Sequence, residues 1–235
     1  METIFWGDRT SAIDPETLGD VTAETVLMQE PYKTLQERLG FKACVMMHQV
    51  HGTNGYCIKP LTDLSQLLLR SQEADFLVTD CKQVALAVLT ADCLPIVFID
   101  KKKQVIAIAH AGWKGTVNKI AQKTVMAMSD QFGSELSNIK VFFGPSALVC
   151  CYEVQQPFSL ALAQDPFAQK SLIERNHKIY FDVTYYNQLT LQAMGISPEV
   201  FNFQAQRCTI CTPGYCSYRG QNGTQLRNIT SVSLK

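Results

Sequence analysis

The sequence predicts one domain that mixes α-helices with β-strands. Short apolar runs with a strand-like pattern alternate with amphipathic helical segments, and no repeat, low-complexity tract or linker separates them. The chain has 235 residues, of which 46% are hydrophobic and 18% are charged. This length can bury a substantial core, and this composition is typical of globular proteins. We therefore expect residues 1–235 to form a single domain.

Charge and chain termini argue against several classes of protein. Basic and acidic residues number 21 each, and no basic stripe indicates a nucleic-acid or membrane partner. The first ten residues lack the regions of a signal peptide, and no window approaches the roughly 20 apolar residues of a membrane span. Nine cysteines, an odd number, favour a reducing cytoplasm, where most would be small buried hydrophobes.

The N-terminal third predicts few regular elements. Residues 1–20 carry turn signals and predict an irregular segment. Residues 21–39 predict a helix with Thr22 as a cap and Gly40 as its stop, and Pro31 is where it would break in two. Strands are predicted at residues 45–50, 56–58 and 75–79, with a connector over residues 61–70.

Two buried β-runs, residues 84–89 and 104–109, form the centre of the prediction. The first leads to Cys93 and the second ends at His110, and a third run over residues 94–99 follows the cysteine directly. Strand ends hold side chains rigidly while leaving them open to a cleft. A thiol and an imidazole placed in this way predict a functional site. Lys101–Lys103 predicts the solvated turn between the last two runs.

The remaining elements follow from local pattern. Residues 116–128 predict an amphipathic helix with Thr116 as its N-cap. Further strands are predicted at residues 141–143, 179–181, 200–203 and 229–234, further helices at 152–162 and 183–194, and a structured loop at 208–227.

His51 adds a second imidazole to Cys93 and His110. Two nitrogens and one sulfur are the ligand set of an open catalytic zinc site, whose fourth position is left for water or substrate. The alternative without a metal is that the cysteine is buried and the two histidines are packed for structural reasons only. A second alternative makes Cys93 a nucleophile paired with His110, with Asp92 orienting the imidazole. His48 would face the opposite side of a strand from His51, which favours a structural or supporting role, with at most a minor part in binding substrate.

A glycine-rich helix start follows His110. Gly112, Trp113 and Lys114 could form a seat for an anion such as phosphate, although most such helix starts bind nothing. Arg219 and Arg227 flank a glycine loop and could bind phosphate through two N–H groups, or could be surface ion-pair partners.

The C-terminal cysteines allow a different reading. Cys208 and Cys211, with Cys216 nearby, suggest a zinc ribbon. A ribbon needs a second Cys-x-x-Cys pair, and Cys150-Cys151 has the wrong spacing. We therefore expect these to be buried structural cysteines.

Several segments together resemble the YfiH family, formerly called laccase-domain or multicopper polyphenol oxidases. The resemblance covers roughly residues 41 to 230, and the TADC and AHAGW segments are its most specific parts. The segments are HQVHGT at 48–53, VTD at 78–80, LAVLTADCLPIVF at 86–98, AHAGWKGT at 109–116, FGPSALVCCYEV at 143–154 and SYR at 217–219. Residues 6–11 and 217–227 depart from the glycine-rich and arginine-rich segments usual in that family.

The resemblance implies an α+β fold of packed mixed sheets flanked by helices. It implies zinc held by His51, Cys93 and His110, with copper as the less favoured metal. It also implies phosphorolysis of adenosine, inosine and methylthioadenosine to the base and ribose 1-phosphate, a transferase reaction, and deamination of adenosine, a hydrolase reaction. The partners would be a nucleoside and phosphate, and the oligomeric state is left open between monomer and dimer.

Three other functions compete with this one. A copper-dependent polyphenol oxidase would need a cluster with mostly imidazole ligands, and the chain has only four histidines. A Cys-His hydrolase would use Cys93 directly. A protein that keeps the fold but binds a partner would have no activity on either adenosine or inosine.

Overall fold

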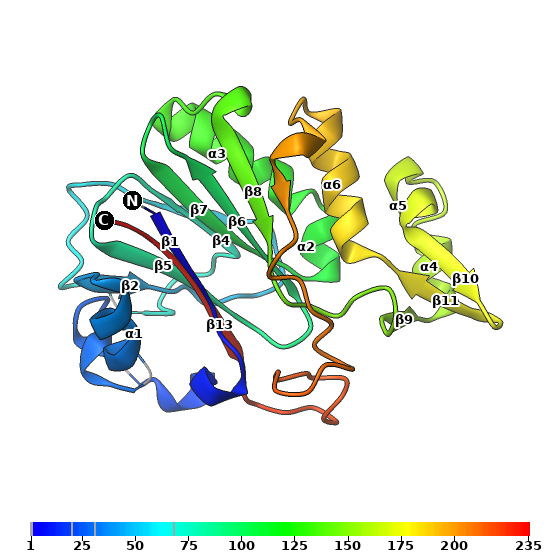
Figure 1. Cartoon of the computed structure of the whole chain (residues 1–235), viewed down its shortest axis with the longest axis horizontal. Helices are drawn as coiled ribbons and strands as arrows, with labels where there is room; N and C mark the ends of the chain where they lie inside the picture. The colour runs from blue at the N-terminus through cyan, green and yellow to red at the C-terminus, as the bar shows by residue number, and fades with distance from the viewer. Residues whose placement is uncertain (1, 20, 31, 68) are drawn as a thin grey trace.

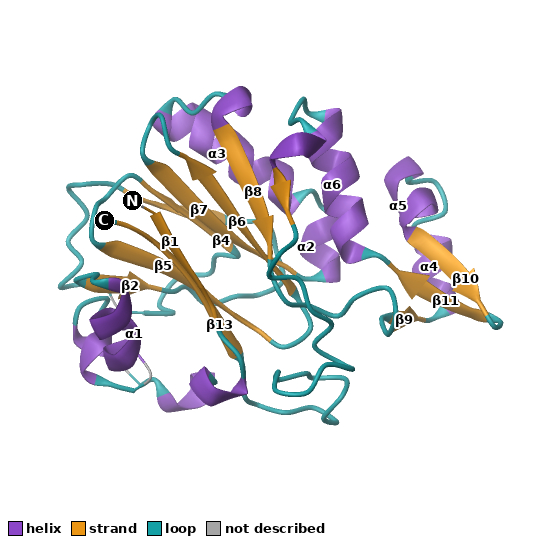
Figure 2. Ribbon diagram, in the orientation of Figure 1, coloured by secondary structure: helices purple, strands orange, loops and turns teal. Residues whose placement is uncertain are grey.

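Two packed β-sheets and a small third sheet form the protein, with helices on the outside (Figures 1 and 2). The computed structural model describes residues 2–19, 21–30, 32–67 and 69–235. This architecture confirms the α+β class of packed mixed sheets. Within the described residues, no helix is both long enough and apolar enough to cross a membrane.

The four-stranded sheet brings together the two ends of the chain. Its order is β1-β13-β5-β2, with β2 parallel to β5 and the other neighbours antiparallel. Its strands are β1 (Glu2–Trp6), β13 (Asn228–Leu234), β5 (Val84–Thr90) and β2 (Ala43–Val45). The prediction of an irregular N-terminal segment is wrong for residues 2–6, because these residues pair along their whole length with β13. The strand predicted at residues 45–50 is also wrong in extent, since β2 ends at Val45.

The six-stranded sheet has the order β12-β8-β6-β7-β4-β3. Its central strands are antiparallel, and its outer pairs β12/β8 and β3/β4 are parallel. Its strands are β12 (Phe201–Asn202), β8 (Ile139–Phe143), β6 (Leu94–Asp100), β7 (Val105–Ala111), β4 (Phe76–Thr79) and β3 (Gly55–Ile58).

The two large sheets pack face to face, which explains the continuous apolar runs of β5, β6 and β7. Successive residues of β6 point to opposite sides: Val97 and Ile99 join the core between the sheets, whereas Ile96 and Phe98 join the core beneath the helices. Every residue of the three strands is buried. The predicted turn at Lys101–Lys103 is confirmed as the exposed β6–β7 hairpin.

Helices α3 and α6 cover the outer face of the six-stranded sheet (Figure 1). The helix predicted over residues 116–128 is instead two, because Lys119 adopts a left-handed conformation with φ of 66°. Thr116 is therefore no N-cap: it is buried in the shorter helix, where its Oγ1 accepts a hydrogen bond from Asn187. The helices are α2 (Trp113–Val117), α3 (Ile120–Phe132) and α6 (Val183–Ala193).

The remaining elements flank this core. The small sheet has the order β10-β11-β9 and lies beside α4 and α5 (Figure 2). The predicted helices at residues 21–39 and 152–162 are wrong in extent: the first is a 3-10 turn and α1, and the second begins with strand β9. Pro31 itself lies outside the described residues. The bounds are α1 (Tyr32–Leu39), β9 (Glu153–Val154), α4 (Gln156–Ala161), α5 (Pro166–Ser171), β10 (Leu172–Arg175), β11 (Lys178–Phe181) and 3-10 helices Arg9–Ser11, Pro15–Thr17, Thr25–Met28, Leu136–Asn138 and Pro198–Val200.

Candidate metal centre

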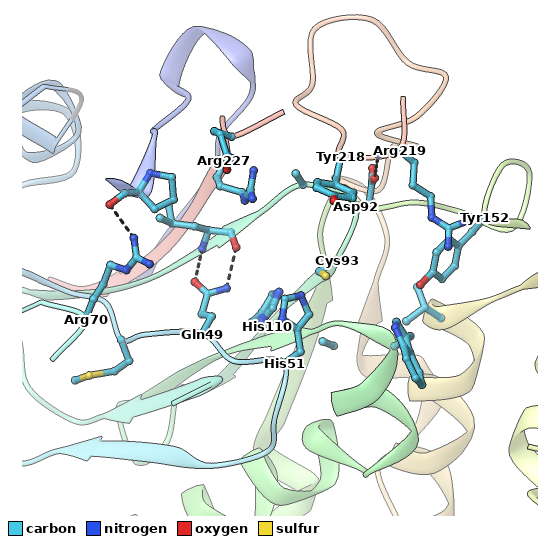
Figure 3. Close-up of a pocket in the computed structure, with 18 of the residues that line it drawn as sticks. Gln49, His51, Arg70, Asp92, Cys93, His110, Tyr152, Tyr218, Arg219 and Arg227 are labelled. Carbon is cyan, nitrogen blue, oxygen red and sulfur yellow. Dashed lines mark hydrogen bonds between the residues drawn. The ribbon is translucent and has the colours of Figure 1, made fainter. Parts of the chain in front are cut away.

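His51, Cys93 and His110 converge where the two large sheets meet (Figure 3). One ligand atom from each lies within 4.8 Å of the other two. Cys93 occupies the turn between β5 and β6, where the chain crosses from one sheet to the other. In the six-stranded sheet Leu94 pairs with Ala111, which brings Cys93 beside His110 on β7. His51 arrives from the loop after β2.

Asp75 holds two of these residues in place. Asp75 is 1% exposed, and its Oδ1 lies 2.8 Å from His110 Nδ1. Because a carboxylate only accepts hydrogen bonds, this contact puts the ring proton on Nδ1 and leaves Nε2 for a metal. The backbone N–H groups of Val50, His51 and Gly52 also donate to the carboxylate, at 3.3, 3.0 and 2.6 Å. They fix the loop in which His51 has a positive φ of 61°.

Asp75 is the residue that sequence reasoning missed. Its only local signal is its position directly before an apolar strand, which is common in proteins. The role of orienting an imidazole, predicted for Asp92, belongs to Asp75. The Asp92 carboxylate instead accepts hydrogen bonds from Thr209 Oγ1 at 2.7 Å and from the backbone N–H of Arg219 at 2.8 Å.

The thiol and the imidazole stabilise each other's charge. Burial alone would raise the pKa of Cys93, but the charge of His110 and hydrogen bonds from His110 and His51 outweigh it and lower the pKa to about 6. Burial likewise opposes the charge on His110, yet the Cys93 thiolate and the Asp75 carboxylate raise the pKa of that imidazole to about 9. The metal-free centre is therefore a thiolate–imidazolium pair near neutral pH.

Gly112 allows this close approach. A Cβ at this position would lie 2.8 Å from His51 Cδ2 and 3.1 Å from Cys93 Sγ. Its backbone φ of −67° is ordinary, so the need for glycine here comes from space and not from conformation.

A cavity of about 480 Å³ opens above the three residues (Figure 3). One wall carries Arg70 and Arg227, and the other carries Tyr152, Tyr218 and Arg219. The Arg219 guanidinium lies 4.4 Å from the centre of the Tyr152 ring and donates to the backbone carbonyl of Glu153. The lining residues are Pro15, Glu16, Met47, Gln49, His51, Arg70, Leu89, Ala91, Asp92, Cys93, His110, Ala111, Trp113, Tyr152, Val183, Tyr218, Arg219, Gln225 and Arg227.

The other predicted site residues divide between the cavity and the surface. Trp113 lines the cavity, with its ring edge-on to Phe158 at 5.1 Å between centroids. Lys114 is exposed and outside the lining, and it is the second residue of a helix of only five residues. His48 is also exposed and outside the lining, and its backbone bridges to Glu73.

Comparison with known proteins gives this geometry a context. Residues 18–235 match the family model described as multi-copper polyphenol oxidoreductase laccase. A purine nucleoside phosphorylase of Borreliella burgdorferi is 37% identical over 69% of this chain and 68% of its own length. One of Aquifex aeolicus is 36% identical over 69% and 71%. Adenosine deaminase RL5, from an unknown prokaryotic organism, is 32% identical over 63% and 57%.

Solved structures share the fold along the whole chain. The Bacillus licheniformis protein YfiH superimposes with a TM-score of 0.83, at 24% identity, and the match covers 100% of this chain and 93% of that one. The resemblance inferred from the sequence motifs is thus confirmed. The chain belongs to the YfiH, or laccase-domain, family, whose relatives named above are purine nucleoside enzymes.

Proposed function

We propose that the protein is a zinc-dependent purine nucleoside enzyme. It would cleave adenosine, inosine or methylthioadenosine with phosphate to give the base and a ribose 1-phosphate, and it would also deaminate adenosine. The observation that carries the proposal is the convergence of His51, Cys93 and His110 at a cavity of about 480 Å³. The names of the relatives support the same reaction class.

The donor set fits zinc. Two imidazoles and a thiolate would hold the ion, and the cavity side leaves a coordination position for a ligand. Asp75 orients His110 as carboxylates commonly do behind a metal-binding imidazole. When bound, the zinc ion supplies a Lewis acid at the centre of the cavity.

The layout of the cavity suits phosphorolysis. In this reaction the bond from ribose C1′ to the purine nitrogen breaks, a bond from C1′ to a phosphate oxygen forms, and the leaving base gains a proton. Base and phosphate must therefore lie on opposite sides of the ribose. The three ligands lie between a wall with Arg70 and Arg227 and a wall with Tyr152 and Tyr218 (Figure 3).

The side chains of one wall can bind phosphate, and those of the other wall can bind the purine base. Guanidinium groups offer paired N–H donors that match a phosphate, so we assign phosphate to the Arg70/Arg227 wall. Aromatic rings stack on purines, so we assign the base to the wall of Tyr152 and Tyr218. Arg219 uses one N–H group on Glu153 and has others to offer the nucleoside. Trp113 lines the cavity and would border the base, whereas Gly112, Lys114 and His48 lie outside the lining and have no part in this assignment.

Two alternatives make different predictions about metal. A multicopper oxidase needs more imidazole ligands than this chain can bring together, since His48 and His177 are both exposed and apart from the centre. A Cys-His hydrolase is favoured by the thiolate–imidazolium pair and would work without any metal.

The test combines metal content with product analysis. Protein purified without added metal is assayed for bound metal and then incubated with adenosine, with and without phosphate. We expect zinc and no copper, adenine with ribose 1-phosphate only when phosphate is present, and inosine in either case. Cys93→Ala should abolish activity, whereas Cys81→Ala, a thiol outside the cavity lining, should not. Several coppers per chain, or activity that survives Cys93→Ala, would contradict the proposal.

A further inference from the structure

Four cysteines converge at a second place in the molecule. Cys150 and Cys151 lie in the loop after β8, and Cys208 and Cys211 lie in the loop after β12. Their four Sγ atoms all lie within 4.8 Å of one another. The prediction of buried cysteines holds for Cys208 and Cys216 but is wrong for Cys211, which is exposed. Although Cys150-Cys151 lacks the spacing of a Cys-x-x-Cys pair, the fold brings these two cysteines to Cys208 and Cys211.

The sulfur distances match a metal site better than disulfide bonds. Four sulfurs bound to one zinc at about 2.3 Å lie about 3.8 Å apart at the corners of a tetrahedron. Cys150 Sγ and Cys211 Sγ are 4.0 Å apart. A disulfide requires about 2.05 Å, and all nine cysteines are free thiols.

The backbone fixes this convergence. Ser146 forms a parallel bridge with Cys208, in which the Thr209 N–H donates to the Ser146 carbonyl at 2.9 Å and the Ser146 N–H donates to the Arg207 carbonyl at 3.0 Å. The two cysteine-bearing loops are thus held side by side by main-chain contacts.

The Cys208–Cys211 turn has a defined backbone shape. The Thr212 N–H donates to the Cys208 carbonyl at 2.9 Å and closes the turn that carries both cysteines of the Cys-x-x-Cys pair. The sulfurs of this pair lie within 4.8 Å of each other and of the sulfurs of Cys150 and Cys151.

We propose that Cys150, Cys151, Cys208 and Cys211 bind a structural zinc ion, separate from the candidate metal centre at His51, Cys93 and His110. Four thiolates with no open position are the donor set of a closed structural site. Cys150 and Cys211 are exposed, so the ion can enter from solvent without opening the fold. This proposal does not depend on the proposed enzymatic activity.

The four-cysteine site would stabilise the turn that carries Cys93. Ala147 N–H donates to the Asp92 carbonyl at 2.8 Å, and Thr209 Oγ1 donates to the Asp92 carboxylate at 2.7 Å. Both donors belong to the loops that hold the four cysteines. Tyr152, on the cavity wall, directly follows Cys151. The ion would therefore join the two loops that position one edge of the cavity.

The experiment isolates this site in a Cys93→Ala background, which removes a ligand of the other centre. The reduced, metal-free protein is titrated with Co²⁺, and thiolate-to-cobalt charge-transfer absorbance is recorded before displacement by Zn²⁺. We expect about one Co²⁺ per chain, with the spectrum of four thiolates in a tetrahedron. Cys150→Ser with Cys211→Ser should lose this binding, whereas Cys81→Ser should keep it.

Both serine substitutions replace exposed thiols, so the fold should survive and can be checked by circular dichroism. Unchanged cobalt binding in the double variant would overturn the proposal. So would the absence of any thiolate–cobalt band in the Cys93→Ala protein, or disulfides among the four cysteines in zinc-loaded protein found by mass spectrometry. The cobalt measurement follows metal binding and not product formation, so its result is independent of whether the proposed function is correct.

Discussion

Replacing Asp75 by asparagine should weaken zinc binding while preserving the shape of the side chain. The carboxylate receives four hydrogen bonds: His110 Nδ1 and the His51 N–H on one oxygen, and the N–H groups of Gly52 and Val50 on the other. An amide has only one oxygen, so one of these pairs must face an NH₂ group. Keeping the 2.6 Å contact to Gly52 turns the NH₂ group toward His110 and His51.

Two costs follow from that orientation. His110 would have to accept at Nδ1, which moves its proton to Nε2, the nitrogen that the metal needs. Loss of such a supporting partner typically lowers metal affinity about 10- to 100-fold, which corresponds to roughly 1.4–2.7 kcal/mol. The His51 N–H would lose its acceptor, and an unsatisfied buried donor costs about 1–3 kcal/mol of folding free energy.

The assay is competition for Zn²⁺ against a fluorescent chelator, with urea unfolding of the metal-free protein alongside. Asp100→Asn is the matched control, because Asp100 is a buried aspartate at the far end of β6 that accepts the N–H groups of Lys102 and Lys103. The control should leave zinc affinity unchanged. Wild-type zinc affinity in Asp75→Asn would refute the reasoning about the proton on His110.

Three further predictions concern the same cavity. Gly112→Ala should lower zinc affinity with little loss of stability, because the new Cβ would meet His51 and Cys93 at 2.8 and 3.1 Å; titration and thermal unfolding would separate the two effects. Zinc binding at about pH 7.5 should release about one proton, since Cys93 (pKa about 6) is already a thiolate there and His110 (pKa about 9) is still protonated. Below pH 6 both Cys93 and His110 should release a proton on binding zinc, and above pH 9 neither should, so calorimetry in buffers of different ionisation enthalpy should find proton release that falls as the pH rises. Arg219→Ala should lower kcat/KM for adenosine roughly tenfold through lost hydrogen bonding in the cavity, and an unchanged value would show that this guanidinium does not contact the substrate.

Local sequence pattern was enough to find the strands at the centre of the fold. Residues 84–89, 94–99 and 104–109 are continuous apolar runs, and the structure places them in β5, β6 and β7, buried on both faces. Such strands can be recognised from the sequence because a strand buried on both faces is apolar at every position and does not alternate between apolar and polar residues. Strand β1 could not be found in this way, since residues 2–6 form a strand only because β13, from a distant part of the sequence, supplies the pairing partner.

Residue chemistry was enough to propose three metal ligands, because few side chains can bind zinc and the chain has only four histidines. Their convergence was decided by tertiary structure: the β5–β6 crossover and the register of β6 against β7 bring Cys93 to His110, and Asp75 fixes the loop of His51. The four-cysteine site depended even more on the fold, since main-chain pairing of two distant loops overrides an unpromising spacing. The sequence by itself determined which atoms could take part, through side-chain chemistry and local periodicity. Only the tertiary structure decided which of them meet, because contacts between distant segments depend on strand register and sheet packing, which no local window contains.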